Sequence, residues 1–150
     1  MKPVTRPAED RGFTMIELMV VVLLIGILVG IGLPTLLGAQ IRAQDRAAQA
    51  DIRNAFTAER AYFTDTLTYT TDASAMSAIE AAIAYVAGDT PLSVGVVYLH
   101  FHAGPNEIFI STMSSSGTCF YLREADGGGA SFAGASACDS TDTQTYGPTW

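Results

Sequence analysis

An uncharged apolar run near the amino terminus constrains the fold of this chain more than any other feature. No charged side chain occurs from Leu18 to Ile41, although charged residues make up 15% of the 150 residues. The stretch from Leu18 to Leu37 has the length of roughly 20 apolar residues that a helix needs to cross a bilayer. The sequence therefore predicts a membrane-spanning segment, and an acidic residue, Glu17, directly precedes its uncharged run.

The residues before the run do not follow the order of a secretory signal peptide. The leader "MKPVTRPAEDRG" ends in Gly12, and no Ala-x-Ala cleavage site closes the apolar run. The run continues into amphipathic sequence, so we expect it to be retained. Arginines flank the run on both sides and leave its orientation open. We expect the acidic, cysteine-containing remainder to lie outside the cell.

The stretch "RGFTMIELMVVVLLIGILVGIGLP" resembles the class III signal of type IV pilins and related pseudopilins. That signal has a short basic leader ending in Gly, then an aromatic residue, three further residues, Glu and a long apolar helix. The resemblance covers about residues 1–60 and depends on Gly12, Phe13 and Glu17. It implies a leader of residues 1–12, cleavage by a prepilin peptidase between Gly12 and Phe13, N-methylation of Phe13, and polymerisation through the helix.

Glu17 is expected to set the axial register between subunits. After cleavage Phe13 carries an ammonium group four residues before Glu17, which is about one helical turn. An unpaired carboxylate in an apolar filament core is costly, and a neighbour's Phe13 amine removes that cost only at the right offset. In the alternative interpretation, Glu17 of a plain membrane anchor lies at the bilayer surface. That interpretation does not explain why Gly12 and Phe13 accompany it.

Glycines and a proline interrupt the apolar run. Gly26 and Gly30 have the GxxxG spacing that allows close helix packing in lipid. Pro34 lacks a backbone N–H group and weakens a helix. We predict a helix break at Gly26, Gly30, Gly32 and Pro34, where the chain unwinds locally in the filament.

The predicted fold class is α+β. One helix is expected from about Phe13 to Phe63, with a hydrophobic transmembrane and filament-core part (13–38) and an amphipathic part (39–63). Its apolar face and its arginine face fall on different sides. The apolar face contains Ile41, Ala48, Ile52, Ala55, Phe56 and Phe63, and the other face contains Arg42, Arg46, Gln49, Arg53 and Arg60.

Residues 64–150 are expected to form a small head on the second half of this helix. A short helix is predicted from about Ser74, its possible cap, to Val86. Strand patterns follow at 93–101, 106–113 and 118–124, with short turns that favour a three-stranded antiparallel sheet. One face of such a sheet needs a partner, which we expect to be the stripe of Ile52, Phe56 and Phe63.

The Gly-, Ser- and Ala-rich tail is too polar to build its own core. Cys119 and Cys138, the two cysteines of an exported region, predict one disulfide, and two free thiols are the alternative. The type IV pilin resemblance also implies a disulfide-bounded carboxyl-terminal region. Phe132, Tyr146 and Trp150 are expected to dock the tail on the head.

The sequence predicts no enzyme, no catalytic residues, no metal site and no cofactor. His100 and His102 form an HxH pair without further ligands nearby, and Asp139 and Asp142 match no calcium loop. The formal net charge of −7 argues against nucleic acid as a primary partner.

The expected function is a structural subunit that polymerises into a helical homopolymer, the type IV pilus filament. The resemblance implies a prepilin peptidase, an assembly ATPase and an inner-membrane platform as partners. Membrane lipid surrounds the helix before assembly, and the assembled filament lies on the cell surface. One alternative is a type II secretion pseudopilin or competence pilin. Another is a monomeric membrane-anchored extracellular binding domain.

Overall fold

The computed structural model of the chain describes residues 12–91, 93–102, 104–125 and 128–150, without the side chain of Asp142. The predicted leader therefore lies outside the described residues except for Gly12. The chain divides into two compact units, Met1–Ala39 and Gln40–Trp150, and the second is called the head unit below.

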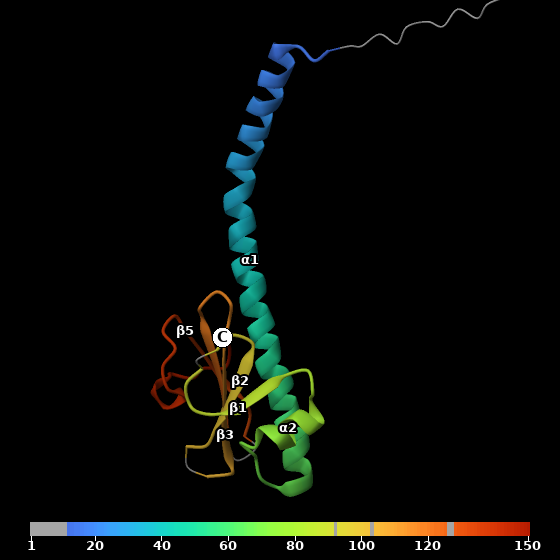
Figure 1. Ribbon diagram of the computed structural model, residues 1–150. Coiled ribbons are helices and arrows are strands. Elements are labelled where there is room, and N and C mark those ends of the chain that lie inside the picture. The colour runs from blue at the N-terminus through green and yellow to red at the C-terminus, as the bar shows by residue number, and fades with distance from the viewer. Residues whose placement is uncertain (1–11, 92, 103, 126–127) are drawn as a thin grey trace, which may run out of the picture. The chain divides into compact units, whose positions relative to one another are not determined.

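Helix α1 extends from Met15 to Thr66 and includes Pro34, so the predicted long helix is confirmed in outline (Figure 1). It begins after Thr14, whose hydroxyl accepts a hydrogen bond from the backbone N–H of Glu17 at 3.2 Å. It ends before Leu67, which has a positive φ of 59°. A residue in this left-handed conformation cannot continue a right-handed helix, so α1 stops there.

Within the head unit, α1 packs its apolar face on the sheet, as the sequence predicts. Its fully buried apolar side chains are Ala48, Ile52, Ala55 and Ala58. Phe56 and Phe63 are partly buried against this core, whereas the side chain of Ile41 is 51% exposed. The predicted stripe of Ile52, Phe56 and Phe63 thus meets the core, whereas Ile41, on the same apolar face, lies before the packed part of the helix.

The head unit contains a sheet of five strands among the described residues, in the order β1-β2-β3-β4-β5. Strands β2, β3 and β4 are the three predicted ones, and they pair antiparallel as expected. The three-strand prediction is incomplete, because β1 adds parallel to β2 and β5 adds antiparallel to β4. The strand bounds are β1 Ala84–Ala87, β2 Val96–His100, β3 Glu107–Met113, β4 Cys119–Ala125 and β5 Ser131–Ala135.

The predicted helix from Ser74 to Val86 is too long. Helix α2 covers only Ala73–Ile79, and residues 84–87 form β1 instead. Asp72, not Ser74, is the N-cap, because its carboxylate accepts a hydrogen bond from the backbone N–H of Ser74 at 2.8 Å. A short 3-10 helix, η1 (Thr141–Thr143), follows in the tail.

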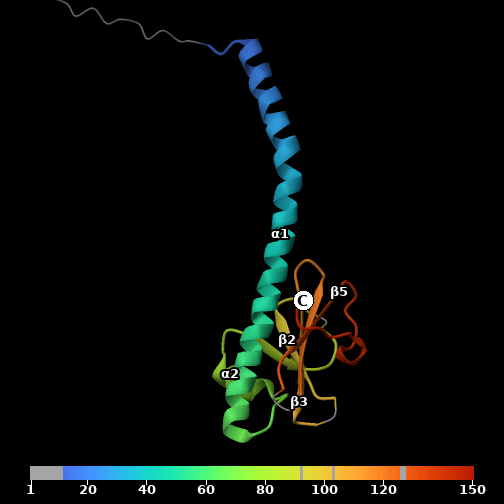
Figure 2. The ribbon, with the colours of Figure 1, turned by 180° about the vertical axis from the view of Figure 1, so that it is seen from behind.

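Different parts of the chain pack on the two faces of the sheet. The inner face packs on the second half of α1 (Figure 2). Leu99, Ile110 and Leu122 on this face are fully buried. On the outer face, Tyr121 packs with residues of β5 and the tail. The alternation of these side chains along β2, β3 and β4 follows the two-residue repeat that the sequence shows.

Candidate functional site

The start of α1 has one half of a capping box, in which the Thr14 hydroxyl caps the backbone N–H of Glu17. Thr14 precedes the first helical residue and Glu17 lies three positions later. The Thr14 hydroxyl lies 3.5 Å from a carboxylate oxygen of Glu17 and accepts the Glu17 backbone N–H. Sequence reasoning missed this cap, although Thr14 and Glu17 form a T-x-x-E pattern.

Phe13 lies outside α1 in this uncleaved chain, and its side chain is 75% exposed. The cap at Thr14 starts α1 after Phe13 in this chain, and the expected one-turn separation of Phe13 and Glu17 after cleavage stays a prediction. Gly12 is also exposed, and a Cβ atom added there would meet no heavy atom within 4 Å. Folding of the described chain does not require a glycine at this position.

The first part of α1 exposes apolar side chains on every side of the helix. An 18-residue window has a mean hydropathy of 2.8, and none of it is buried. By length and composition α1 is able to cross a membrane. Such a surface is far larger than the apolar patches that monomeric proteins expose to water, so it needs lipid or protein around it.

Pro34 lies inside α1 without ending the helix. Its ring nitrogen has no hydrogen to donate to the Gly30 carbonyl group, and the hydroxyl of Thr35 donates to the Gly32 carbonyl at 2.8 Å. A Cβ atom added at Gly26, Gly30 or Gly32 would meet no heavy atom within 4 Å. The glycines are thus unconstrained in the isolated chain, and the predicted break in a filament stays a prediction.

Two carboxylates are fully buried in the head unit, and sequence reasoning missed both. Glu124 of β4 accepts a hydrogen bond from Nη2 of Arg60 at 2.9 Å, and its other oxygen has no hydrogen-bond partner among the described residues. Tyr69 packs beside this pair. Burial raises the pKa of Tyr69 to about 12, and the nearby Glu124 carboxylate acts in the same direction.

Glu59 is the second buried carboxylate. One oxygen accepts the backbone N–H of Thr70 at 3.2 Å, while the other lacks a partner within the described part of the chain. Burial raises the pKa of Glu59 to about 7. A signal was present in the sequence, because Glu59 follows Ile52 and Ala55 at helical spacing on the buried stripe.

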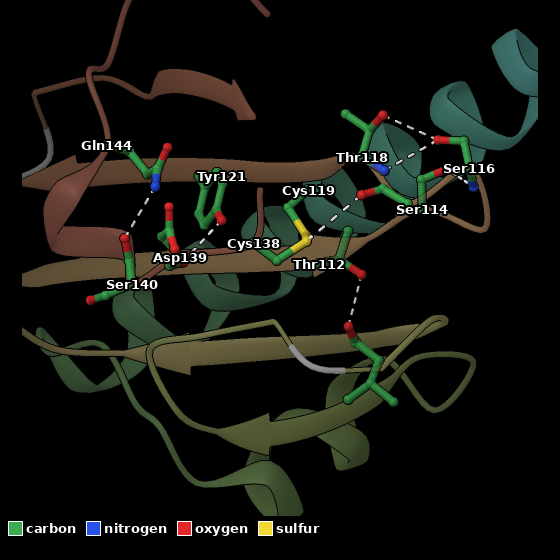
Figure 3. Close-up of a disulfide and its surroundings, with 12 residues drawn as sticks. Thr112, Ser114, Ser116, Thr118, Cys119, Tyr121, Cys138, Asp139, Ser140 and Gln144 are labelled. Carbon is green, nitrogen blue, oxygen red and sulfur yellow. Dashed lines mark hydrogen bonds between the residues drawn. A yellow bond between two sulfur atoms is a disulfide. The ribbon is translucent and has the colours of Figure 1, made fainter. Parts of the chain in front are cut away.

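The predicted disulfide joins Cys119 at the start of β4 to Cys138 in the tail, with the two Cα atoms 5.4 Å apart (Figure 3). Next to it, the Tyr121 hydroxyl donates to the Asp139 carbonyl at 3.0 Å. In the entropic model, closing a loop of this length stabilises the fold by roughly 3 kcal/mol. The bond therefore holds the start of the tail against the outer face of the sheet.

Aromatic contacts dock the rest of the tail, as predicted. Trp150 packs on Phe120 and Phe132 with ring centroids 5.2 and 4.9 Å away. Tyr146 packs edge-on against Phe109 at 5.9 Å. The described residues contain no group of three or more His, Cys, Asp or Glu side chains that would hold a metal ion.

The comparisons with known proteins agree with this arrangement. Residues 8–33 match the model of the prokaryotic N-terminal methylation motif. The chain is 39% identical over 57 residues to the type IV major pilin protein PilA of Myxococcus xanthus, a match covering 38% of this chain and only 26% of that protein. It is 30% identical over 118 residues to the type IV wide pilus major component PilA4 of Thermus thermophilus, which covers 79% of this chain and 84% of the relative.

A methylation motif at the start of an exposed apolar helix, with an α+β head on the same helix, defines a pilin-like subunit. The similarity to the Thermus protein extends along most of both chains. The chain belongs to the type IV pilin family. The relatives named here are structural pilus components.

Proposed function

We propose that this chain is the structural subunit of a type IV pilus filament. The similarity to a wide pilus major component over 84% of that protein's length carries this conclusion, because it includes the head as well as the helix. The exposed apolar surface of α1 supplies the physical reason for assembly. Each copy removes that surface from lipid or water by packing against other copies.

Cleavage between Gly12 and Phe13 by a prepilin peptidase is the first step of the proposal. The methylation motif, which covers both residues, supports it. So does the exposed position of Gly12 and Phe13 ahead of the capped helix, because a peptidase needs access to an extended backbone. Cleavage leaves an ammonium group on Phe13, which is then N-methylated.

Glu17 provides the register in this proposal. Its carboxylate lies in the first turn of α1, where the helix dipole favours negative charge. The contact with the Thr14 hydroxyl leaves it exposed in the isolated chain. In a packed core it would need a positive partner, and the Phe13 ammonium group of a neighbouring copy has the required charge.

The apolar part of α1 exchanges one environment for another during assembly. Lipid surrounds residues 13–38 in the membrane, and neighbouring helices replace it in the filament. Gly26 and Gly30 leave room for close contact, since nothing in the described chain fills the space above them. Local unwinding near Pro34 would let the filament extend under load.

The remaining partners follow from this function. A filament that grows from the membrane needs an inner-membrane platform and an assembly ATPase to extract subunits from lipid. The subunit is therefore placed in the cytoplasmic membrane before assembly and on the cell surface afterwards. Leader peptide 1–12, helix segments 13–38 and 39–63, and head 64–150 are the corresponding functional parts.

Two measurements test the proposal. Mass spectrometry of the native protein is expected to find N-methylated Phe13 as the first residue. Electron microscopy of material sheared from the cell surface is expected to find filaments that contain this chain. A chain that keeps Met1 and stays monomeric would overturn the proposal and favour a membrane-anchored binding domain.

A further inference from the structure

Three arginines on the head part of α1 have no ionic partner within the described residues. Arg42, Arg46 and Arg53 are exposed, and their side chains make no ion pair or hydrogen bond there. Asp45, which lies between two of them in sequence, instead accepts a hydrogen bond from Ser116 of the β3–β4 turn. Arg42 and Arg46 are four residues apart, so their like charges repel on the helix surface.

Two acidic residues, one in the last turn of α1 and the other at the end of α2, are also in locally unfavourable positions. Asp65 lies in the last turn of α1, which has no basic residue, and Glu80 is the C-cap of α2. The carboxyl end of a helix dipole is negative, so it disfavours both carboxylates, of which Glu80 accepts one hydrogen bond, from the backbone N–H of Ala82 at 3.2 Å. Neither makes an ion pair in the part of the chain that the structure describes.

A groove of about 210 Å³ lies between α1 and the end of α2. Asp65 follows one of its alanines, Ala61, by one helical turn. The methylene groups of an arginine can pack on the alanine surface while its guanidinium group reaches carboxylates at the rim. The lining residues are Asn54, Thr57, Ala58, Ala61, Ile79 and Glu80.

We propose that Arg42 and Arg46 of one copy bind this groove, together with Asp65 and Glu80, on a second copy. The inference rests on the proposed function, since it names the contact between heads in the filament. Each residue that is unfavourable alone gains an opposite charge in this contact. Local conflicts of this kind are expected where a second molecule completes the site.

The positions of the charges select the arrangement of the two copies. Arg42 and Asp65 are separated by 23 residues of continuous helix, about 35 Å at 1.5 Å per residue. Parallel copies shifted by roughly this distance bring opposite charges together, whereas copies in register oppose like charges. Pairing of Phe13 with Glu17 needs a shift of only about 6 Å, so the two contacts join different pairs of copies. The two surfaces are different, and a head-to-tail contact that does not close on itself generates a filament.

The overall charge of the head explains why this contact matters. Residues 64–150 contain nine acidic residues and one arginine, a formal charge of −8. Two such surfaces repel each other, and the arginines of α1 are the positive groups available to offset that repulsion.

Charge reversal in the full-length chain tests the proposal. One variant carries Arg42→Glu with Arg46→Glu, a second carries Asp65→Lys with Glu80→Lys, and a third combines all four. Filaments sheared from the cell surface are measured relative to mature subunit in the membrane. Each double variant is expected to lose at least tenfold in filaments, and the combined variant is expected to regain most of them. A control adds charge at exposed Ser115 and Thr145 and is expected to keep wild-type filament levels.

Wild-type filament levels in both double variants, or no recovery in the combined variant, would overturn this inference and leave the pilin function standing. Absence of wild-type filaments would instead overturn the proposed function. If a reversed chain fails to accumulate, the neutral pairs Arg42→Gln with Arg46→Gln and Asp65→Asn with Glu80→Gln replace it. Each neutral pair is expected to lose filaments, and unchanged levels in both would again count against the contact.

Discussion

Nη2 of Arg60 on α1 donates a hydrogen bond at 2.9 Å to Glu124, a carboxylate that is fully buried under β4. The arginine side chain is 53% exposed, so one partner of the pair is in water and the other is in the core. Arg60 therefore neutralises a charge that β4 carries into the interface between helix and sheet.

Replacing Arg60 by Ala is expected to destabilise the head unit by roughly 2–4 kcal/mol, because it leaves a buried carboxylate unpaired. Urea unfolding of the detergent-solubilised chain, followed by the fluorescence of Trp150, measures the change. The double variant Arg60→Ala with Glu124→Gln is expected to recover part of the loss. A single variant as stable as the wild type would show that the pair contributes nothing.

Glu59 predicts a pH dependence of stability. Burial raises the pKa of Glu59 from 4.5 to about 7, so between these values the folded state binds more protons than the unfolded state. The free energy of unfolding is therefore expected to fall by about 3 kcal/mol as the pH rises through this interval. Above about pH 7 this contribution is lost and the curve levels off.

Unfolding curves at several pH values check this expectation, with Glu59→Gln as the matched control. Burial also raises the pKa of Asp51, so Asp51 also makes the free energy of unfolding fall as the pH rises. The Glu59→Gln variant removes only the contribution of Glu59, so its free energy of unfolding is expected to depend less steeply on pH. Identical slopes in both proteins would contradict the assignment.

Glu17→Ala is expected to leave leader removal largely intact and to reduce surface filaments strongly, because the register charge is gone. Filament yield and the mass of the mature chain are the two measurements. Thr14→Ala is the control, since it removes the cap hydroxyl and keeps the carboxylate. Loss of the cap costs about 1 kcal/mol of helix stability. Normal filaments from Glu17→Ala would refute the register argument.

Gly12→Val is expected to leave uncleaved precursor in the membrane. The space around Gly12 accepts a side chain without contact, so the variant tests recognition by the peptidase rather than folding. Immunoblotting for precursor and mature chain is the measurement. Mature-sized protein in this variant would contradict the predicted cleavage site.

Replacing Cys119 and Cys138 by Ser is expected to destabilise the head unit by about 3 kcal/mol in the entropic model. The tail is expected to become sensitive to protease, because its first anchor on β4 is lost. Limited proteolysis of the full chain measures this. A tail that stays fully resistant would show that the aromatic contacts of Tyr146 and Trp150 suffice.

The parts of the fold that depend on local patterns were predictable. The apolar run and the helical periodicity gave α1 to within a few residues at each end. Alternating side chains gave β2, β3 and β4. Two cysteines in the polar region after the apolar run predicted the disulfide, because they can pair only with each other within the chain.

The parts that depend on distant partners were not predictable. Residues 84–87 are short and follow a helical pattern, and only parallel pairing with β2 makes them a strand. Residues 131–135 read as a polar tail, and pairing with β4 makes them β5. The burial of Glu59 and Glu124 arises where helix and sheet meet, so neither local sequence alone reveals it.

The edge strands of the sheet affect how neighbouring heads can contact one another in a filament. A filament holds many heads at very high local concentration, and long open strand edges would invite mispairing between them. Here β1 is only four residues long, and α2 packs beside it. At the opposite edge of the sheet, Phe132 of β5 and Gly147 of the tail exchange two backbone hydrogen bonds at 2.7 and 2.8 Å. The chain's own tail therefore pairs with the outer edge of β5. Neighbouring heads are thereby steered towards side-chain contacts and away from amyloid-like strand addition.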